Sequence, residues 1–352
     1  MKRVKQILAG SEKQYGKGVI SLGGAAHYVE RIPTGIFPFD LATGGGFPKG
    51  KVSIVFGPES SAKTTLLLKT IAEFQRTHPN EYAAFVDAEV ALDLNWAKKL
   101  GVDMNRLVHI IPDYAEQAID ITTELLYASD VGIVGVDSIA ALTSSVELEQ
   151  SAETQAVGRS GLNAGKLYRR ATIALGRARR GNRYPALICL NQVRYKIGVM
   201  HGDPETQPGG KPFMFAAALM VRLYGKDIVD KKIHPTLPWC KEIQGVIRKQ
   251  KIGVVARNFK FKLPIINMED KKVRLGQVEA FNTVTHYLGL LGHFEKLKKG
   301  YRVFDDTYST LIELRQTLLE DPDFKRQVEQ VIIDEMVERA GLLEGSENAP
   351  ES

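Results

Sequence analysis

Cysteine is nearly absent from this sequence. The 352 residues include only Cys189 and Cys240, too few for a disulfide framework, so we expect a reducing compartment. No apolar run approaches the roughly 20 residues that span a bilayer. The basic segment 1–8 has no apolar signal core, so we expect a cytoplasmic protein that is neither secreted nor membrane-bound.

Acidic residues are missing from one long stretch. Residues 154–202 carry ten Lys and Arg and no Asp or Glu. Residues 1–153 carry 14 basic and 19 acidic residues, and residues 203–352 carry 23 basic and 22 acidic residues. The net charge of +6 is therefore concentrated in one region. On charge alone, a polyanion partner such as nucleic acid and a solvated basic helix face are both possible.

The composition is that of a globular protein, with 44% hydrophobic and 25% charged residues. This excludes a wholly disordered, collagen-like or coiled-coil chain, and the length suggests one large core with a smaller module. Short apolar strands alternate with helical stretches, which predicts an α/β fold with a mostly parallel sheet and helices on both faces. We expect strands at 51–56, 82–86, 106–111, 131–136, 186–190, 243–252 and 259–267.

Four segments follow from the same pattern. An amphipathic stretch at 3–15 precedes several glycines, so we expect residues 1–30 to form a helical arm for oligomerisation. Residues 31–268 would form the α/β core, and residues 269–343 a small, mostly helical C-terminal domain. Residues 344–352 are polar and include three glutamates without a basic residue, which indicates a disordered tail.

A phosphate-binding loop is predicted directly after the strand at 51–56. Backbone N–H groups and a helix N-terminus at such a loop cradle phosphates. Lys63 would neutralise the β- and γ-phosphates, and the Thr64 hydroxyl would ligate Mg²⁺, so we predict ATP and Mg²⁺ as cofactors. Ala62 stands where the pattern has glycine, and a positive φ there would cost about 1–2 kcal/mol. The nine loop residues are Gly57, Pro58, Glu59, Ser60, Ser61, Ala62, Lys63, Thr64 and Thr65.

Carboxylates follow two other predicted strands. Asp137 ends the apolar run at 131–136, and strands of a parallel sheet end at one edge, so Asp137 would lie near the phosphate loop and hold Mg²⁺. The alternative for Asp137 is a helix N-cap. Asp87 and Glu89 end the strand at 82–86, and either could orient and deprotonate an attacking water.

Four segments in order carry a family resemblance: 57–65, 85–93, 136–142 and 190–206. Together they closely resemble the RecA family of bacterial-type DNA recombinases, over about residues 7–257. The resemblance implies a RecA-type P-loop ATPase core. It also implies DNA recombination and repair: an ATP-dependent helical filament on single-stranded DNA that pairs with a homologous duplex and exchanges strands.

The resemblance also implies roles for individual residues. Glu89 matches the catalytic glutamate and Gln192 the glutamine that senses the γ-phosphate, and Gln192 would act as a two-state switch between nucleotide and DNA. Lys249 and Lys251 match a lysine pair that reaches the ATP of the neighbouring subunit. With Lys63, these residues form the catalytic set that we expect.

Nucleotide and subunit contacts are implied in the same way. Trp96 lies where the family has an aromatic residue packed on adenine, and Asp93 lies where an aspartate contacts the base. Phe215 resembles a phenylalanine between subunits.

Two segments are implied to bind DNA. Residues 151–161 occupy the place of the family's first DNA-binding loop, and residues 193–210 match the second. The glycines would make the second loop flexible and its cations would track a phosphate backbone. The DNA-binding residues that we expect are Arg159, Arg169, Arg194, Lys196, Gly198, Val199, Met200, Thr206, Gly209 and Gly210.

Several departures indicate a divergent member, compatible with a phage-encoded one. Ala62 replaces a glycine, Val90 stands where histidine is common, and His201 where an aromatic residue is usual. They leave a role in the repressor cleavage of the SOS response unsupported. Two alternatives remain open: a ring-forming helicase on the same core, and a nucleotide-gated DNA coat in which Ala62 has reduced turnover.

Overall fold

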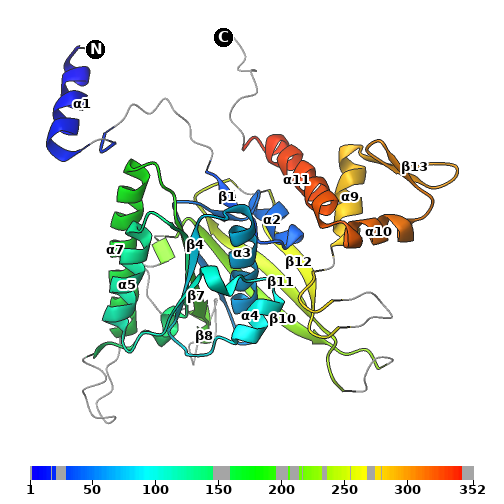
Figure 1. Ribbon diagram of the computed structural model, residues 1–352, viewed down its shortest axis with the longest axis horizontal. Coiled ribbons are helices and arrows are strands. Elements are labelled where there is room, and N and C mark those ends of the chain that lie inside the picture. Colours follow the sequence, from blue (N-terminus) through cyan, green and yellow to red (C-terminus); the bar gives the residue numbers. More distant parts are fainter. Residues whose placement is uncertain are drawn as a thin grey trace.

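A computed structural model gives the fold. It describes residues 2–16, 18–20, 29–145, 159–195, 205–206, 214–215, 217–231, 236–253, 255–267, 274–278 and 280–342. A central sheet is flanked by helices on both faces, which confirms the predicted α/β fold (Figure 1). The helix α1 (Lys2–Tyr15) stands apart from this core in the same view. None of the helices in these ranges combines the length and apolar character needed to cross a membrane.

The main sheet has eight strands in the order β12-β11-β10-β3-β7-β6-β4-β5. The six strands from β10 to β5 are mutually parallel, and β11 and β12 extend the sheet as antiparallel neighbours. All seven strands expected from the sequence are present in it. The strands are β3 (Val52–Gly57), β4 (Tyr82–Asp87), β5 (Leu107–Ile110), β6 (Val131–Asp137), β7 (Ala186–Gln192), β10 (Leu219–Ile228), β11 (Cys240–Gln250) and β12 (Asn258–Pro264).

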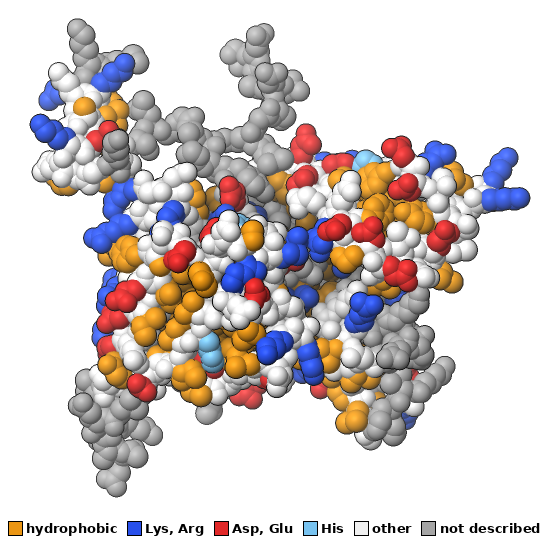
Figure 2. Space-filling view, in the orientation of Figure 1, with side chains coloured by type: hydrophobic (Ala, Val, Ile, Leu, Met, Phe, Trp, Pro, Cys, Tyr) orange, Lys and Arg blue, Asp and Glu red, His pale blue; other side chains and the backbone are white. Residues whose placement is uncertain are grey.

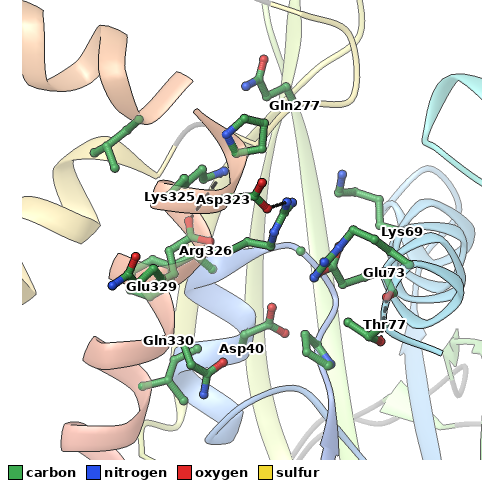
Figure 3. A pocket seen from close by; sticks show the side chains of 18 of the residues that line it. Asp40, Lys69, Glu73, Thr77, Gln277, Asp323, Lys325, Arg326, Glu329 and Gln330 are labelled. Atoms are coloured by element: carbon green, nitrogen blue, oxygen red, sulfur yellow. Dashed lines mark hydrogen bonds and ion pairs between the residues drawn. The ribbon is translucent and has the colours of Figure 1, made fainter. Parts of the chain in front are cut away.

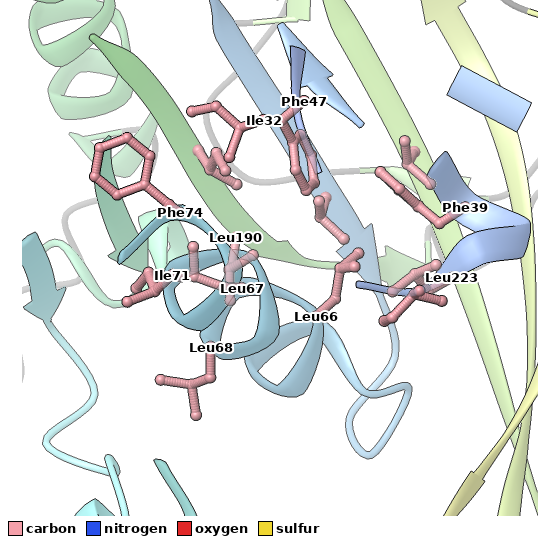
Figure 4. Packing of buried hydrophobic residues seen from close by; sticks show 14 of the residues in the cluster. Ile32, Phe39, Phe47, Leu66, Leu67, Leu68, Ile71, Phe74, Leu190 and Leu223 are labelled. Carbon is pink, nitrogen blue, oxygen red and sulfur yellow. The ribbon is translucent and has the colours of Figure 1, made fainter. Parts of the chain in front are cut away.

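One face of the sheet is covered by α3 (Lys63–Thr77) and the short helices α2 (Phe37–Thr43) and α4 (Leu94–Lys99). In α3 the residues Leu67, Ile71 and Phe74 recur at helical spacing, so they form one apolar stripe that is fully buried (Figure 4). This stripe packs on β3, β6 and β7 and fixes the direction of the helix that follows the phosphate loop.

The opposite face carries α5 (Ala115–Tyr127) and α7 (Arg159–Arg180). Basic side chains follow the edge formed by α7, with acidic ones between them (Figure 2). Lys166 Nζ lies 3.7 Å from Glu116 Oε1, and Arg170 pairs with Asp120. Part of the acid-free stretch is therefore neutralised by α5. The buried hydrophobic residues of α7 are Ala164, Leu167, Ala171, Ala174, Leu175 and Ala178.

The C-terminal elements have a hydrophobic cluster of their own. As expected they include helices, α9 (Phe281–Leu291), α10 (Leu311–Glu320) and α11 (Pro322–Arg339). The cluster also takes in Phe37 and Leu41 of α2, so these elements pack on the core. A three-stranded sheet stands between α9 and α10 and was not predicted. Its strands are β13 (Phe294–Lys296), β14 (Tyr301–Val303) and β15 (Asp306–Tyr308).

Two 3₁₀ helices, Met104–Arg106 and Ile139–Ala141, and two small antiparallel strand pairs complete the described elements. One joins β1 (Arg31–Ile32) to β2 (Phe47–Pro48), and the other joins β8 (Arg194–Tyr195) to β9 (Glu205–Thr206). The second pair joins the start of the predicted second DNA-binding loop to residues 205–206 of the same loop. The predicted tail at 344–352 lies outside the described residues.

Candidate functional site at the carboxyl edge of the sheet

The ends of four parallel strands meet at one edge of the sheet. Gly57 of β3 lies opposite Gln192 of β7, and Asp87 of β4 lies opposite Asp137 of β6. Parallel strands all end at the same edge, which is where ligands bind in open α/β sheets. The structure thus brings together the strand-end residues that the sequence singled out.

The predicted phosphate loop is the turn between β3 and α3. Gly57 is required by close approach, because a Cβ there would lie 2.5 Å from Leu223 O of β10. Ala62 immediately precedes α3 with φ 65° and ψ 26°, in the left-handed region. The alanine therefore stands in the strained conformation that the glycine of the usual pattern adopts freely.

Lys63 begins α3 and folds over the loop. Its Nζ donates to Pro58 O at 2.8 Å and to Gly57 O at 3.2 Å. Burial lowers the pKa of Lys63, and the nearby Asp137 and Glu89 carboxylates partly offset that effect. A cation at the N-terminus of a helix is well placed to bind a phosphate group.

Thr64 and Asp137 form the pair expected to hold a metal ion. The Thr64 hydroxyl donates to Asp137 Oδ2 at 2.6 Å. Burial raises the pKa of Asp137 to about 6, with Glu89 and Asp87 adding to it and the Thr64 bond and Lys63 opposing it. One hydroxyl and one carboxylate fit Mg²⁺, which takes one or two protein oxygens and completes its shell with phosphate and water.

Asp87 and Glu89 differ sharply in their surroundings. Asp87 is buried and accepts from the backbone N–H groups of Ala91 and Leu92, both at 3.1 Å, with His109 Nε2 at 3.3 Å. It therefore fixes the segment after β4. Glu89 is exposed, so of the two carboxylates it is the one that a water at this edge can reach.

Glu89 is held from two neighbouring strand ends. Gln192 Nε2 donates to Glu89 Oε1 at 3.0 Å, and the Ser138 hydroxyl donates to the same oxygen. Gln192 is the last residue of β7, and β8 begins two residues later at Arg194. One amide side chain thus connects the carboxylate to the strand end from which the predicted second DNA-binding loop departs.

Trp96 and Asp93 lie beside the loop on α4. Trp96 Nε1 is 3.4 Å from Thr65 Oγ1, so the indole borders the start of α3. Asp93 caps α4, because its Oδ1 accepts from the N–H groups of Asn95 and Trp96. The cap orients the helix that presents the tryptophan.

Lys249 and Lys251 lie at the opposite, amino edge. Leu219 of β10 pairs with Gln250 on one side and with Ser53 on the other, so this end of β11 lies at the same edge of the sheet as the start of β3, with β10 between them. Lys249 Nζ donates to the carbonyls of Met214 and Phe215 at 2.7 and 2.6 Å. The two lysines cannot reach the phosphate loop of their own chain.

Most of the predicted DNA-binding residues lie outside the described side chains. Arg169 is described, and it is exposed on α7. Only the backbone is described for Arg159, Arg194 and Thr206. The predicted residues outside the described ranges are Lys196, Gly198, Val199, Met200, Gly209 and Gly210.

The prediction missed three residues at this edge. Ser138 binds Glu89, and its place directly after Asp137 was the available signal. Lys241 Nζ donates to Ser60 O at 3.2 Å and pairs with Asp227, joining β11 to the phosphate loop. Arg222 is 2% exposed, with its guanidinium 3.9 Å from the centre of the Tyr224 ring. No motif marks either cation.

Known proteins resemble the chain over most of its length. A family model described as the RecA N-terminal domain matches residues 2–267. The protein RecA of Mesoplasma florum is 35% identical over 296 residues, which are 82% of this chain and 85% of that protein. The protein RecA of Aquifex pyrophilus is 44% identical over 218 residues, 61% of each chain. That of Prochlorococcus marinus is 44% identical over 220 residues, 62% of this chain and 56% of the relative. The chain thus spans less than two thirds of the last two relatives.

Proposed function

Because the chain belongs to the RecA family, we propose that it is an ATP-dependent recombination and repair protein. It assembles on single-stranded DNA as a helical filament, pairs that strand with a homologous duplex and exchanges strands. The observation that carries the proposal is Gln192, which donates to Glu89 and ends the strand that leads into the predicted DNA-binding loop. This activity belongs in the cytoplasm, with residues 31–268 as the ATPase core and 269–343 as a small C-terminal domain.

Hydrolysis needs a base beside the γ-phosphate. Glu89 takes the proton of the attacking water, and Ser138 and Gln192 hold its carboxylate in place. Lys63 and the loop N–H groups neutralise the phosphates. When bound, Mg²⁺ would supply further charge neutralisation, held by Thr64 and Asp137.

DNA dependence follows from the position of Gln192. The Gln192 amide can bond to Glu89 or to a γ-phosphate, and each bond gives a different conformation to the start of the segment that follows β7. DNA that orders this segment favours one of the two arrangements, so it alters hydrolysis. By reciprocity, nucleotide alters DNA affinity.

Strand exchange between a labelled single strand and a homologous duplex tests the proposal. We expect product with ATP and none without it. DNA-stimulated phosphate release should be lost in Lys63→Ala and Glu89→Gln. Closed rings in electron microscopy, with directional unwinding and no exchange, would contradict the proposal.

One observation favours a second candidate function. Ala62 has a left-handed backbone at the phosphate loop, and this strain could slow turnover enough to leave a nucleotide-gated DNA coat. The coat predicts ATP-dependent DNA binding without phosphate release. Phosphate release that rises on adding single-stranded DNA excludes it.

A further inference from the structure

The neighbouring strands β10 and β11 both contact the phosphate loop just before Ala62. A Cβ at Gly225 of β10 would lie 2.8 Å from Ser60 O, so this strand approaches the loop backbone closely. Lys241, the second residue of β11, reaches the same carbonyl, since its Nζ donates to Ser60 O at 3.2 Å. Two strands that are distant from the loop in sequence therefore meet it at one peptide group.

The ammonium group of Lys241 is fixed from its own sheet. Asp227 of β10 lies directly opposite Lys241 in the strand register, and Asp227 Oδ1 is 3.2 Å from Lys241 Nζ. The Lys241 side chain is only 22% exposed. A side chain that is packed and paired in this way loses little further conformational freedom when it binds the loop, whereas a mobile surface lysine would lose much more.

The loop has an unfavourable backbone at this point. Ser60 has φ 58° and Ala62 has φ 65°, so two residues with side chains stand in the left-handed region within three positions. This conformation is costly for a residue with a Cβ, and it persists where surrounding contacts fix it. The bond from Lys241 fixes the carbonyl of the first of the two residues, so it opposes relaxation of the loop to an unstrained backbone.

A fixed carbonyl also fixes the N–H group of the same peptide. Because the Ser60–Ser61 peptide group is planar and trans, its N–H points away from its carbonyl, and so away from Lys241. Phosphate loops bind their ligand through such N–H groups. The carbonyls of Gly57 and Pro58 are held by Lys63, which must leave them to bind a phosphate. Lys241 comes from another strand, so its bond to Ser60 can persist while Lys63 binds the phosphate.

We propose that Lys241 is a positioning residue of the phosphate loop, which holds the Ser60–Ser61 peptide group in the orientation that binds phosphate. The inference rests on the proposed function, because it takes the loop to bind ATP. Asp227 in turn holds Lys241 in place. The contact also explains how an alanine can stand at position 62: a side chain from outside the loop stabilises a backbone that the usual glycine would adopt by itself.

Equilibrium binding of a fluorescent ATP analogue tests the orientation of the loop without turnover. Lys241→Met keeps the aliphatic stem and removes the donor. Lys260→Met is the control, because it removes another lysine of the same sheet, one that pairs with Glu242 at 2.8 Å. We expect the dissociation constant to rise about five- to tenfold in Lys241→Met and to stay within about twofold in the control. Lys241→Arg, which retains a donor, should recover most of the loss. Equal constants in the two methionine variants would overturn the inference.

A double-mutant cycle separates an effect on the loop backbone from a general effect on the fold. Glycine adopts the left-handed backbone freely, so the loop should depend less on Lys241 in the Ala62→Gly background. There we expect Lys241→Met to raise the dissociation constant by no more than about twofold. An equal loss of affinity in both backgrounds would show that Lys241 does not act through the loop backbone, and would overturn the inference.

Asp227→Asn distinguishes positioning from direct attraction between the Lys241 charge and the phosphates. If the charge acts through space, removal of the neighbouring carboxylate makes this region more positive and raises the affinity for ATP. If Lys241 acts by holding the loop, loss of the carboxylate frees the lysine and lowers the affinity. We expect a loss of about two- to threefold, and a gain would overturn the positioning role.

Steady-state kinetics complete the test. Because the loop holds the phosphates both before and during hydrolysis, Lys241→Met should raise the KM for ATP in the DNA-stimulated reaction and leave kcat within about twofold. A fall in kcat at unchanged KM would place Lys241 in the chemical step and overturn the positioning role. The binding measurements need neither DNA nor strand exchange. An unaltered protein that binds the analogue but exchanges no strands would therefore refute the proposed function and leave this inference intact.

Discussion

The backbone of Ala62 is the most unusual feature of the phosphate loop at the residue scale. A side chain in the left-handed region costs roughly 1–2 kcal/mol, and glycine avoids this cost. We expect Ala62→Gly to raise the free energy of unfolding by about 1 kcal/mol, measured by urea denaturation. Nucleotide affinity should rise or stay unchanged.

The same substitution inside α3 is the control. Ala72 lies in the interior of that helix, so Ala72→Gly should lower the free energy of unfolding by about 1 kcal/mol. A clear loss of nucleotide affinity in Ala62→Gly would show that the loop depends on the methyl group.

Glu89 and Asp87 give a second contrast between neighbours. Glu89→Gln keeps the bonds from Ser138 and Gln192 possible but removes the base, so we expect phosphate release to fall about 10²–10⁴-fold with nucleotide binding retained. Asp87→Asn weakens the acceptor for Ala91 and Leu92, and should cost about 1–2 kcal/mol of stability. Steady-state kinetics and thermal unfolding of both variants check this. Equal losses of turnover in the two variants would contradict the assignment of Glu89 as the base.

Residue identity and spacing predicted the strand-end polar groups because a parallel sheet brings such ends together. They could not predict which of Asp87 and Glu89 is buried, since this depends on how the backbone after β4 folds back onto Asp87. Lys241 could not be predicted either, because its contact with Ser60 joins positions 181 residues apart.

At the scale of elements, α11 packs on α2, and a cleft of about 540 Å³ separates it from α3 (Figure 3). Asp40 of α2, Glu73 and Lys69 of α3, and Lys325 and Glu329 of α11 all face it. Lys325 Nζ is 3.6 Å from Glu329 Oε1, beyond hydrogen-bond distance, and that buried oxygen accepts no hydrogen bond from the described residues.

Burial raises the pKa of Glu329 to about 7, and the pKa of Asp40 to about 8. A raised carboxyl pKa means that the folded state binds the proton more tightly, so stability falls as pH rises from the ordinary value towards the raised one. We expect Glu329→Gln to stabilise the protein by on the order of 1–3 kcal/mol at pH 8 and not at pH 4.5.

Thermal unfolding across this range, with Glu338→Gln as control, measures the effect. Glu338 is exposed on the same helix, so its variant should keep the slope of the unaltered protein. If the stability of Glu329→Gln depends on pH as steeply as that of the control, burial does not raise the pKa of Glu329.

The sequence pattern predicted β3 to β7 well, since buried parallel strands are short apolar runs. It missed β10, in which the buried Arg222 and the exposed end from Tyr224 onwards break both the apolar run and the alternation. It also missed β13 to β15, which have three residues each and depend on pairing rather than on local preference.

At the scale of the whole molecule, the basic residues within 154–202 make several different kinds of contact. Lys166 and Arg170 pair with α5, Arg179 lines a cavity with Lys51 and Lys251 at the amino edge of the sheet, and Arg194 lies at the start of the predicted second DNA-binding loop. The sequence predicted the excess of positive charge. Which of these cations face α5, the cavity or the loop depends on how α7 packs, and the sequence could not predict that.

Because these arginines make different contacts, we expect their substitution to affect DNA binding differently. Arg194→Gln should weaken binding and reduce the salt slope by about 1, because one phosphate contact is lost. Arg170→Gln should leave the slope unchanged, since Asp120 already neutralises that arginine. Fluorescence anisotropy of a labelled single strand over a salt series measures both, and equal slopes in the two variants would contradict a phosphate contact at Arg194.

In the head-to-tail filament that we propose, Lys63 and Lys251 lie at opposite edges of the sheet, so the array has a polarity. One terminal copy would have a phosphate loop that no neighbour's Lys249 and Lys251 complete, and the other would have a lysine pair with no nucleotide to contact. A finite array therefore contains one fewer complete site than it has copies. Turnover per copy should rise with array length, and short DNA strands should be poor activators even when every copy is bound.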